Sequence, residues 1–118
     1  MPPVNLAVVA GTLVKTAEPR LLPDGSTVWE LDVAVRPEGR AATSVPVSWA
    51  TPGPGVDPSA WAPGEEVLVV GAVRRRFYRA GGATVSRTDV LADAVVPARQ
   101  RKRATTVLAQ ALAPLRTG

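Results

Sequence analysis

The stretch from Glu66 to Val96 constrains the fold of this chain more than any other. It begins with the apolar and β-branched run EVLVVGAV, continues as the basic run RRRFYR, and returns after the pair Gly81-Gly82. A Gly-Gly pair between two such runs predicts a β-hairpin. We therefore expect two long antiparallel strands that become cationic near their turn.

Side chains alternate between the two faces of a strand, so every second residue of this run shares a face. We expect Val67 and Val69 to face a core. Arg74, Arg76 and Tyr78 then share the opposite, exposed face. Two guanidinium groups beside a phenol ring suit a phosphate contact next to a base-stacking surface, as in proteins that bind single-stranded nucleic acid. The same arginines would equally suit a solvated edge that resists aggregation, so both interpretations stay open.

Composition excludes several kinds of chemistry. The 118 residues include no cysteine and no histidine. Disulfides, thiolate metal sites and cysteine nucleophiles are therefore excluded, and the commonest general base is missing. The acidic residues form no pattern typical of paired acid–base catalysis or of an oxygen-ligand metal loop. We expect no enzyme activity, no metal site and no cofactor.

Charge is distributed unevenly along a chain whose formal net charge is +4. Residues 74–103 contain nine basic and two acidic side chains, whereas residues 41–73 contain no Lys or Arg. A basic half indicates a polyanionic partner, most simply nucleic acid, with an anionic membrane surface as the alternative. No apolar run is long enough to span a bilayer, and the start lacks the charged segment of a secretory signal. We expect a cytoplasmic, nucleoid-associated protein.

Strand patterns occur at five places. The predicted strands are 4–14, 29–36, 43–49 and the two arms of the 66–96 hairpin. Gly11 marks a bend in the first, and Pro46 puts the third at an edge or leaves its outward amide unpaired. Between the third and fourth strands, Asp57-Pro58 can begin a single helical turn, with Trp61 plugging one end of the core.

The C-terminal residues differ in character from the rest. Residues 98–103 are a basic run, and residues 104–115 carry apolar side chains at helical spacing. An amphipathic helix of this kind docks on its own domain, pairs with a partner chain or lies on a membrane. Packing within the protein's own assembly is our expectation. We divide the chain into a domain over 1–97 and a basic, then amphipathic, tail over 98–118.

Five strands in this order, with a curled first strand and little helix, predict a small closed barrel. The sequence resembles the bacterial single-stranded DNA-binding protein family, whose domain is an oligonucleotide-binding (OB) barrel. The resemblance covers about residues 4–96 and is carried by NLAVVAGTL (5–13), PRLLPDGS (19–26) and residues 64–78. It implies an all-β, five-stranded OB fold with a long hairpin between strands four and five and a vestigial helix between strands three and four. The chain looks like a divergent or secondary member, such as the short paralogues of high-GC bacteria.

The resemblance also implies binding residues, because the family stacks bases on aromatic side chains and lines their path with basic ones. Tyr78 falls on a stacking position, and Trp49 falls where the family commonly has a stacking phenylalanine. Trp49 shares a face with Val45 and Val47, so a core position is the alternative to the surface position that we favour. Phe77 is a further candidate for stacking, but it lies on the side of its strand opposite to Tyr78, so we expect it to cap the barrel. The candidate nucleic-acid-binding residues are Trp49, Arg74, Arg76, Tyr78, Arg79, Arg87, Arg36 and Lys15.

Two departures from the family pattern concern affinity and partners. The family's further stacking positions, near Gly39 and around Thr43-Ser44, hold small or polar residues here, which implies weaker binding. The tail is basic and then apolar, so recruitment of partner proteins through an acidic tip is not expected. The resemblance implies a homotetramer or dimer built partly through the first strand.

The predicted function is sequence-independent binding of single-stranded DNA in replication, recombination or repair, by phosphate neutralisation and base stacking. Two alternatives remain. One is an RNA-binding or accessory, primosome-like OB protein, since a fold alone does not determine its ligand. The other is a structural oligomerisation module that acts through its tail.

Overall fold

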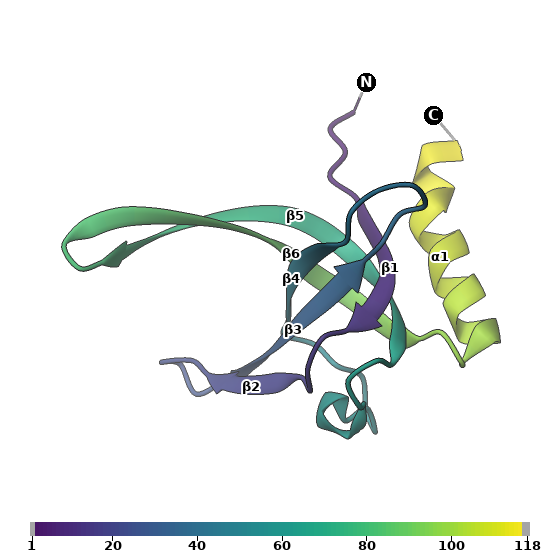
Figure 1. Ribbon diagram of the computed structural model, residues 1–118, viewed down its shortest axis with the longest axis horizontal. Helices are drawn as coiled ribbons and strands as arrows, with labels where there is room; N and C mark the ends of the chain where they lie inside the picture. Colours follow the sequence, from purple (N-terminus) through teal and green to yellow (C-terminus); the bar gives the residue numbers. More distant parts are fainter. Residues whose placement is uncertain (1, 117–118) are drawn as a thin grey trace.

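Strands make up about half of the computed structural model, which describes residues 2–116 (Figure 1). The elements are β1 (Ala7–Leu13), β2 (Glu18–Leu21), β3 (Thr27–Val35), β4 (Thr43–Trp49), the 3-10 helix η1 (Pro58–Ala60), β5 (Glu66–Ala80), β6 (Ala83–Pro97) and α1 (Arg101–Arg116). The five predicted strands are confirmed within a few residues. The short strand β2 was not among the predicted strands, because four residues that include Pro19 carry too little alternation to indicate a strand.

The sheet curls until its two sides meet. Its strands follow the order β1-β5-β6-β4-β3-β2, and β1 also pairs with β3. The pairs Thr12–Ala34 and Leu13–Val33 make this closing contact. Five strands thus form an all-β, barrel-like sheet, with β2 as an outer ribbon on β3. The β4–β6 contact is parallel and the other pairings are antiparallel.

The sequence predicted that Pro46 either lies on an edge strand or leaves its outward amide position unpaired. The second possibility is the one observed. It pairs with Asp32 of β3, whereas the ladder between β4 and β6 begins only at Val47. The missing amide hydrogen of proline therefore costs no hydrogen bond on the β6 side.

The core fills the inside of the curled sheet with branched aliphatic side chains and two tryptophans. The largest fully buried side chains include Trp49, Val33, Val69 and Val95. Trp61 follows η1 and is buried in the same cluster, which confirms its predicted place in the core. Asp57 accepts a hydrogen bond from the Ser59 amide at 3.1 Å and so caps η1, as its sequence predicted.

Two glycines allow strands to approach closely. A Cβ at Gly11 would overlap the Ala34 carbonyl oxygen, at the place where β1 meets β3. A Cβ at Gly71 would overlap the Leu91 carbonyl oxygen, next to a β-bulge where the register of β5 and β6 shifts. Glycine is needed at both positions because any side chain would push the strands apart.

Helix α1 lies beside the barrel-like sheet, near β1 and against β5 and β6 (Figure 1). Its half-buried side chains form one stripe, namely Ala104, Val107, Leu108, Ala111 and Leu112. Leu68 and Val70 of β5 are buried although they do not belong to the inner core cluster. Of the alternatives left open by the sequence, the helix docks on its own sheet.

Over residues 2–116, no helix is long and apolar enough to cross a membrane.

Candidate nucleic-acid interface

A depression of about 510 Å³ lies where the β5–β6 hairpin faces β2 and β3. We call it the outer groove; its lining residues are Arg20, Glu30, Arg76, Phe77, Tyr78 and Arg87. Arg20 comes from β2, Glu30 from β3, and the other four from the hairpin. Glu30 is paired with Ser48 of β4, and both lie on the face of the sheet opposite to the core residues Leu31 and Val47. The groove is therefore an outer surface of the sheet, walled by the hairpin.

The hairpin projects well beyond the barrel-like sheet because its outer part has no other strand beside it (Figure 1). Pairing of β1 with β5 ends at Gly71, and pairing of β4 with β6 ends at Val90. β5 and β6 then continue as a two-stranded arm to the turn at Gly81-Gly82, whose φ values of 58° and 80° suit glycine. At the root of the arm, the Asn5 side chain donates to the Val73 carbonyl at 2.8 Å and accepts from its amide at 3.0 Å.

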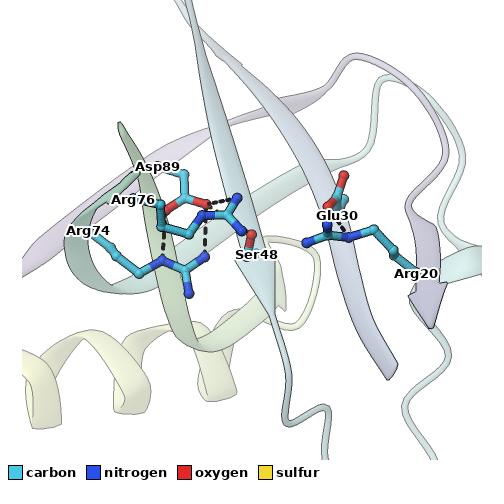
Figure 2. A network of polar contacts seen from close by, with 6 residues as sticks. All are labelled: Arg20, Glu30, Ser48, Arg74, Arg76 and Asp89. Carbon is cyan, nitrogen blue, oxygen red and sulfur yellow. Dashed lines mark hydrogen bonds and ion pairs between the residues drawn. The ribbon is translucent and has the colours of Figure 1, made fainter. Parts of the chain in front are cut away.

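A buried carboxylate organises the arginines at the root of the arm (Figure 2). The Asp89 side chain is 1% exposed and accepts hydrogen bonds from Arg74 Nε at 3.1 Å and Nη2 at 3.0 Å. Arg76 Nη2 donates to the same carboxylate at 3.1 Å, and the Ser48 hydroxyl donates at 3.0 Å. Each arginine side chain is 31% exposed. Both guanidinium groups are thus held in place while part of each faces solvent.

The charge of Asp89 follows from these contacts. Burial acts to raise its pKa, but the hydrogen bonds from Arg74 and Ser48 and the charges of Arg74 and Arg76 outweigh burial. The pKa therefore lies below its ordinary value of 3.8, and the carboxylate is ionised at neutral pH. Two arginines and one aspartate leave a net positive charge at the root of the arm.

The prediction that Arg74, Arg76 and Tyr78 share one exposed face of β5 is confirmed in part. Arg76 and Tyr78 share a face and line the outer groove together. Arg87, directly opposite Arg76 on β6, lines it as well. Arg74 is on the same face but is engaged with Asp89 at the root of the arm.

The predicted surface position of Trp49 is wrong. Its side chain is 2% exposed, and its ring stacks on Trp61 with centroids 6.0 Å apart. Trp49 follows Val47 on the inner face of β4, so closure of the sheet places the indole in the core. It is not available to a nucleic acid.

The predicted capping role of Phe77 is also wrong. Phe77 is 66% exposed and lines the outer groove, with the Arg75 guanidinium carbon 5.2 Å from its ring centroid. Its position on β5 lies beyond the last contact of the arm with β1 and β4, so there is no core for it to cover. Phe77 is instead an exposed aromatic ring that contacts Arg75 on the face of β5 opposite to Tyr78.

Besides Arg74, three predicted basic residues do not line the outer groove. Lys15 pairs with Glu18 at 3.7 Å and with Asp32 at 3.9 Å, in the connection between β1 and β2. Arg36 lines a separate depression beside Gly11. Arg79 donates to the Gly82 carbonyl at 3.2 Å, at the tip of the arm.

Sequence reasoning missed three residues of this region. Asp89 could have been found from the sequence. In a hairpin with a two-residue turn at Gly81-Gly82, the antiparallel register pairs Asp89 with Arg74. Arg20 and Glu30 form an ion pair at 2.8 Å across the β2–β3 ribbon (Figure 2), and they were missed because β2 was not predicted as a strand.

The outer groove offers anion contacts and ring stacking. Arginines donate in a planar fork that suits phosphate, and exposed aromatic faces accept stacked bases. Within residues 2–116, no three acidic side chains are grouped as a metal site requires.

A scan against protein-family models and a search of curated proteins both find no match to this chain. Its function is therefore inferred from the outer groove and from the arrangement of the strands.

Proposed function

We propose that this chain is an OB-fold protein that binds single-stranded DNA in the outer groove, without catalysis. The arrangement of strands supports the fold assignment. An OB barrel has five strands, and it binds oligonucleotides on the face of strands two and three, between two flanking loops. β3 and β4 are the second and third strands of the closed part of this sheet. The β2–β3 ribbon and the β5–β6 arm flank them, and the outer groove lies between those two flanks.

One observation carries the proposal: the outer groove brings the exposed Tyr78 ring and three arginines into a single depression. Tyr78 offers a ring face for stacking, which contributes about 1–3 kcal/mol per base regardless of base identity. Arg76 and Arg87 stand on the same wall and offer guanidinium groups for phosphates. An aromatic ring beside cations matches a flexible chain of alternating bases and phosphates.

The alternative function, oligomerisation through the tail, is less well supported. The apolar stripe of α1 is already half-buried against the chain's own sheet. It is therefore occupied within one molecule and offers little uncovered apolar surface to a partner.

The dimer or tetramer implied by the family resemblance is tested by mass in solution, with and without oligonucleotide.

The proposal is tested by substituting the ring on the groove side of the arm. We expect Tyr78→Ala to weaken binding of a labelled DNA oligomer at low salt by about tenfold to a hundredfold. Leu115→Ala is the control, because Leu115 is an exposed apolar side chain on α1 and does not line the groove. Wild-type affinity should fall steeply with added salt as phosphate contacts are screened.

Fluorescence anisotropy of the labelled oligomer is the suitable readout. Trp49 and Trp61 are in the core and Trp29 packs against it, so tryptophan emission would report poorly on the groove. A matched RNA oligomer used as competitor separates DNA from RNA binding. Absence of any salt-sensitive complex, or wild-type affinity in Tyr78→Ala, would refute the proposal.

A further inference from the structure

The outer groove contains a carboxylate, which is unexpected in a site for a polyanion. Glu30 lies on the outer face of β3, and its side chain is 36% exposed. Its Oε1 atom forms an ion pair with Arg20 Nε at 2.8 Å. Among residues 2–116, this is the ion pair that Glu30 makes, and its second oxygen has no hydrogen-bond partner. Glu30 therefore presents an uncommitted acceptor to the groove.

The two walls of the outer groove differ in charge. Arg76 and Arg87 belong to the arm, while Glu30 and Arg20 belong to the β2–β3 ribbon. Figure 2 shows the Arg20–Glu30 pair set apart from the Asp89 cluster. Because a carboxylate repels phosphate, a bound strand should run its backbone along the arm and turn its bases toward Glu30.

The chemistry of the carboxylate selects among bases. An ionised carboxylate only accepts hydrogen bonds. Cytosine offers an exocyclic amino group as a donor, and a glutamate that accepts from cytosine N4 is an established pairing. Thymine has a carbonyl oxygen at the equivalent position, which a carboxylate repels. Unstacked bases in a single strand expose these edges to the protein.

We propose that Glu30 accepts a hydrogen bond from the amino group of a base stacked on Tyr78, so that the outer groove prefers cytosine over thymine. This inference rests on the proposed function. It adds a bias at one position to a mode of binding that otherwise accepts any sequence.

The test compares oligo-dC with oligo-dT of equal length, bound to the full chain at neutral pH. One hydrogen bond to a charged group, gained with cytosine and lost with thymine, predicts about tenfold tighter binding of oligo-dC. In Glu30→Gln the side-chain amide both donates and accepts, so the ratio of the affinity for oligo-dC to the affinity for oligo-dT should fall toward one. Affinity for oligo-dT should rise in the same variant, because the repulsive charge is gone.

Glu18→Gln is the matched control. Glu18 is the partner of Glu30 across the β2–β3 ribbon, it is exposed, and it does not line the outer groove. The Glu18→Gln substitution removes one negative charge from the same ribbon, as Glu30→Gln does. We expect this variant to change both affinities alike and to keep the wild-type ratio.

The possible outcomes separate the two proposals. Equal binding of oligo-dC and oligo-dT by the wild type, or an unchanged ratio in Glu30→Gln, would overturn the role of Glu30. DNA binding itself would still stand if Tyr78→Ala weakened both complexes. If neither oligomer binds, the proposed function fails and the role of Glu30 fails with it.

Discussion

Replacing Asp89 with asparagine is the sharpest test of how the arm is held. The substitution keeps the shape of the side chain and removes its charge. Arg74 and Arg76 would then lose the carboxylate to which they donate at 3.0–3.1 Å. The remaining carbonyl oxygen of the asparagine can still accept from Ser48, so the loss falls mainly on the two arginines.

The magnitude follows from the burial of the three groups. Breaking a fully buried ion pair by removing one partner costs about 3–5 kcal/mol. Here Asp89 is 1% exposed but the arginines are 31% exposed and can turn toward water. We therefore expect Asp89→Asn to lower the free energy of unfolding by about 2 kcal/mol, after discounting for this exposure. For a chain of this size, that corresponds to a Tm lower by roughly 8 °C.

Thermal unfolding followed by circular dichroism at several pH values tests both the size and the cause of this effect. The folded pKa of Asp89 lies below its ordinary value of 3.8, so the folded state binds fewer protons than the unfolded state in acid. Its stabilisation is complete above that ordinary value and is lost as the pH falls through the folded pKa. The gap in stability between wild type and Asp89→Asn should therefore narrow between about pH 5 and about pH 2.

Asp93→Asn is the matched control on the same strand. Asp93 is exposed, and among residues 2–116 it has no ion pair or side-chain hydrogen bond. Its substitution should leave Tm and its pH dependence close to wild type. An unchanged Tm in Asp89→Asn, or a gap that persists undiminished in acid, would refute the assignment of Asp89 as the charged anchor of the arm.

Two further substitutions test the closed sheet and its core. Gly11→Ala should lower the free energy of unfolding by about 3 kcal/mol, because its Cβ would overlap the Ala34 carbonyl oxygen. Denaturant unfolding measures this, and Gly53→Ala, whose Cβ would be 4.0 Å from the Val56 side chain, should be nearly neutral. Trp61→Ala should cost about 3–5 kcal/mol by the same measurement, since it leaves a cavity against the Trp49 ring. Wild-type stability in either Gly11→Ala or Trp61→Ala would contradict the close approach or the stacked pair.

The sequence predicted the features that depend on neighbours along the chain. Alternation at period two located the strands, and Gly81-Gly82 located the turn of the arm. The same alternation put Arg76 and Tyr78 on one face, because the pleat needs no knowledge of the rest of the fold. Asp57 before Pro58 predicted the cap of η1 for the same reason.

Residues whose role depends on the curling of the sheet were harder to predict. Alternation places Trp49 on a face with Val47, but it does not say whether that face is inside or outside. Phe77 was expected to cap the barrel because the sequence does not show where the arm leaves the other strands. Trp49 is therefore buried where a surface position was predicted, and Phe77 is exposed where a covering position was predicted.

The sequence by itself thus determined the arm, its charge and the face that carries Tyr78, since these follow from local spacing and composition. Only the tertiary structure decided which groups meet the arm. Ser48 reaches Asp89 across 41 residues of chain because β4 lies beside β6, and Glu30 and Tyr78 line the same groove because β3 lies beside β4. Such contacts between distant residues depend on closure of the sheet. Closure is stabilised by burial of the whole core and cannot be predicted from any short segment.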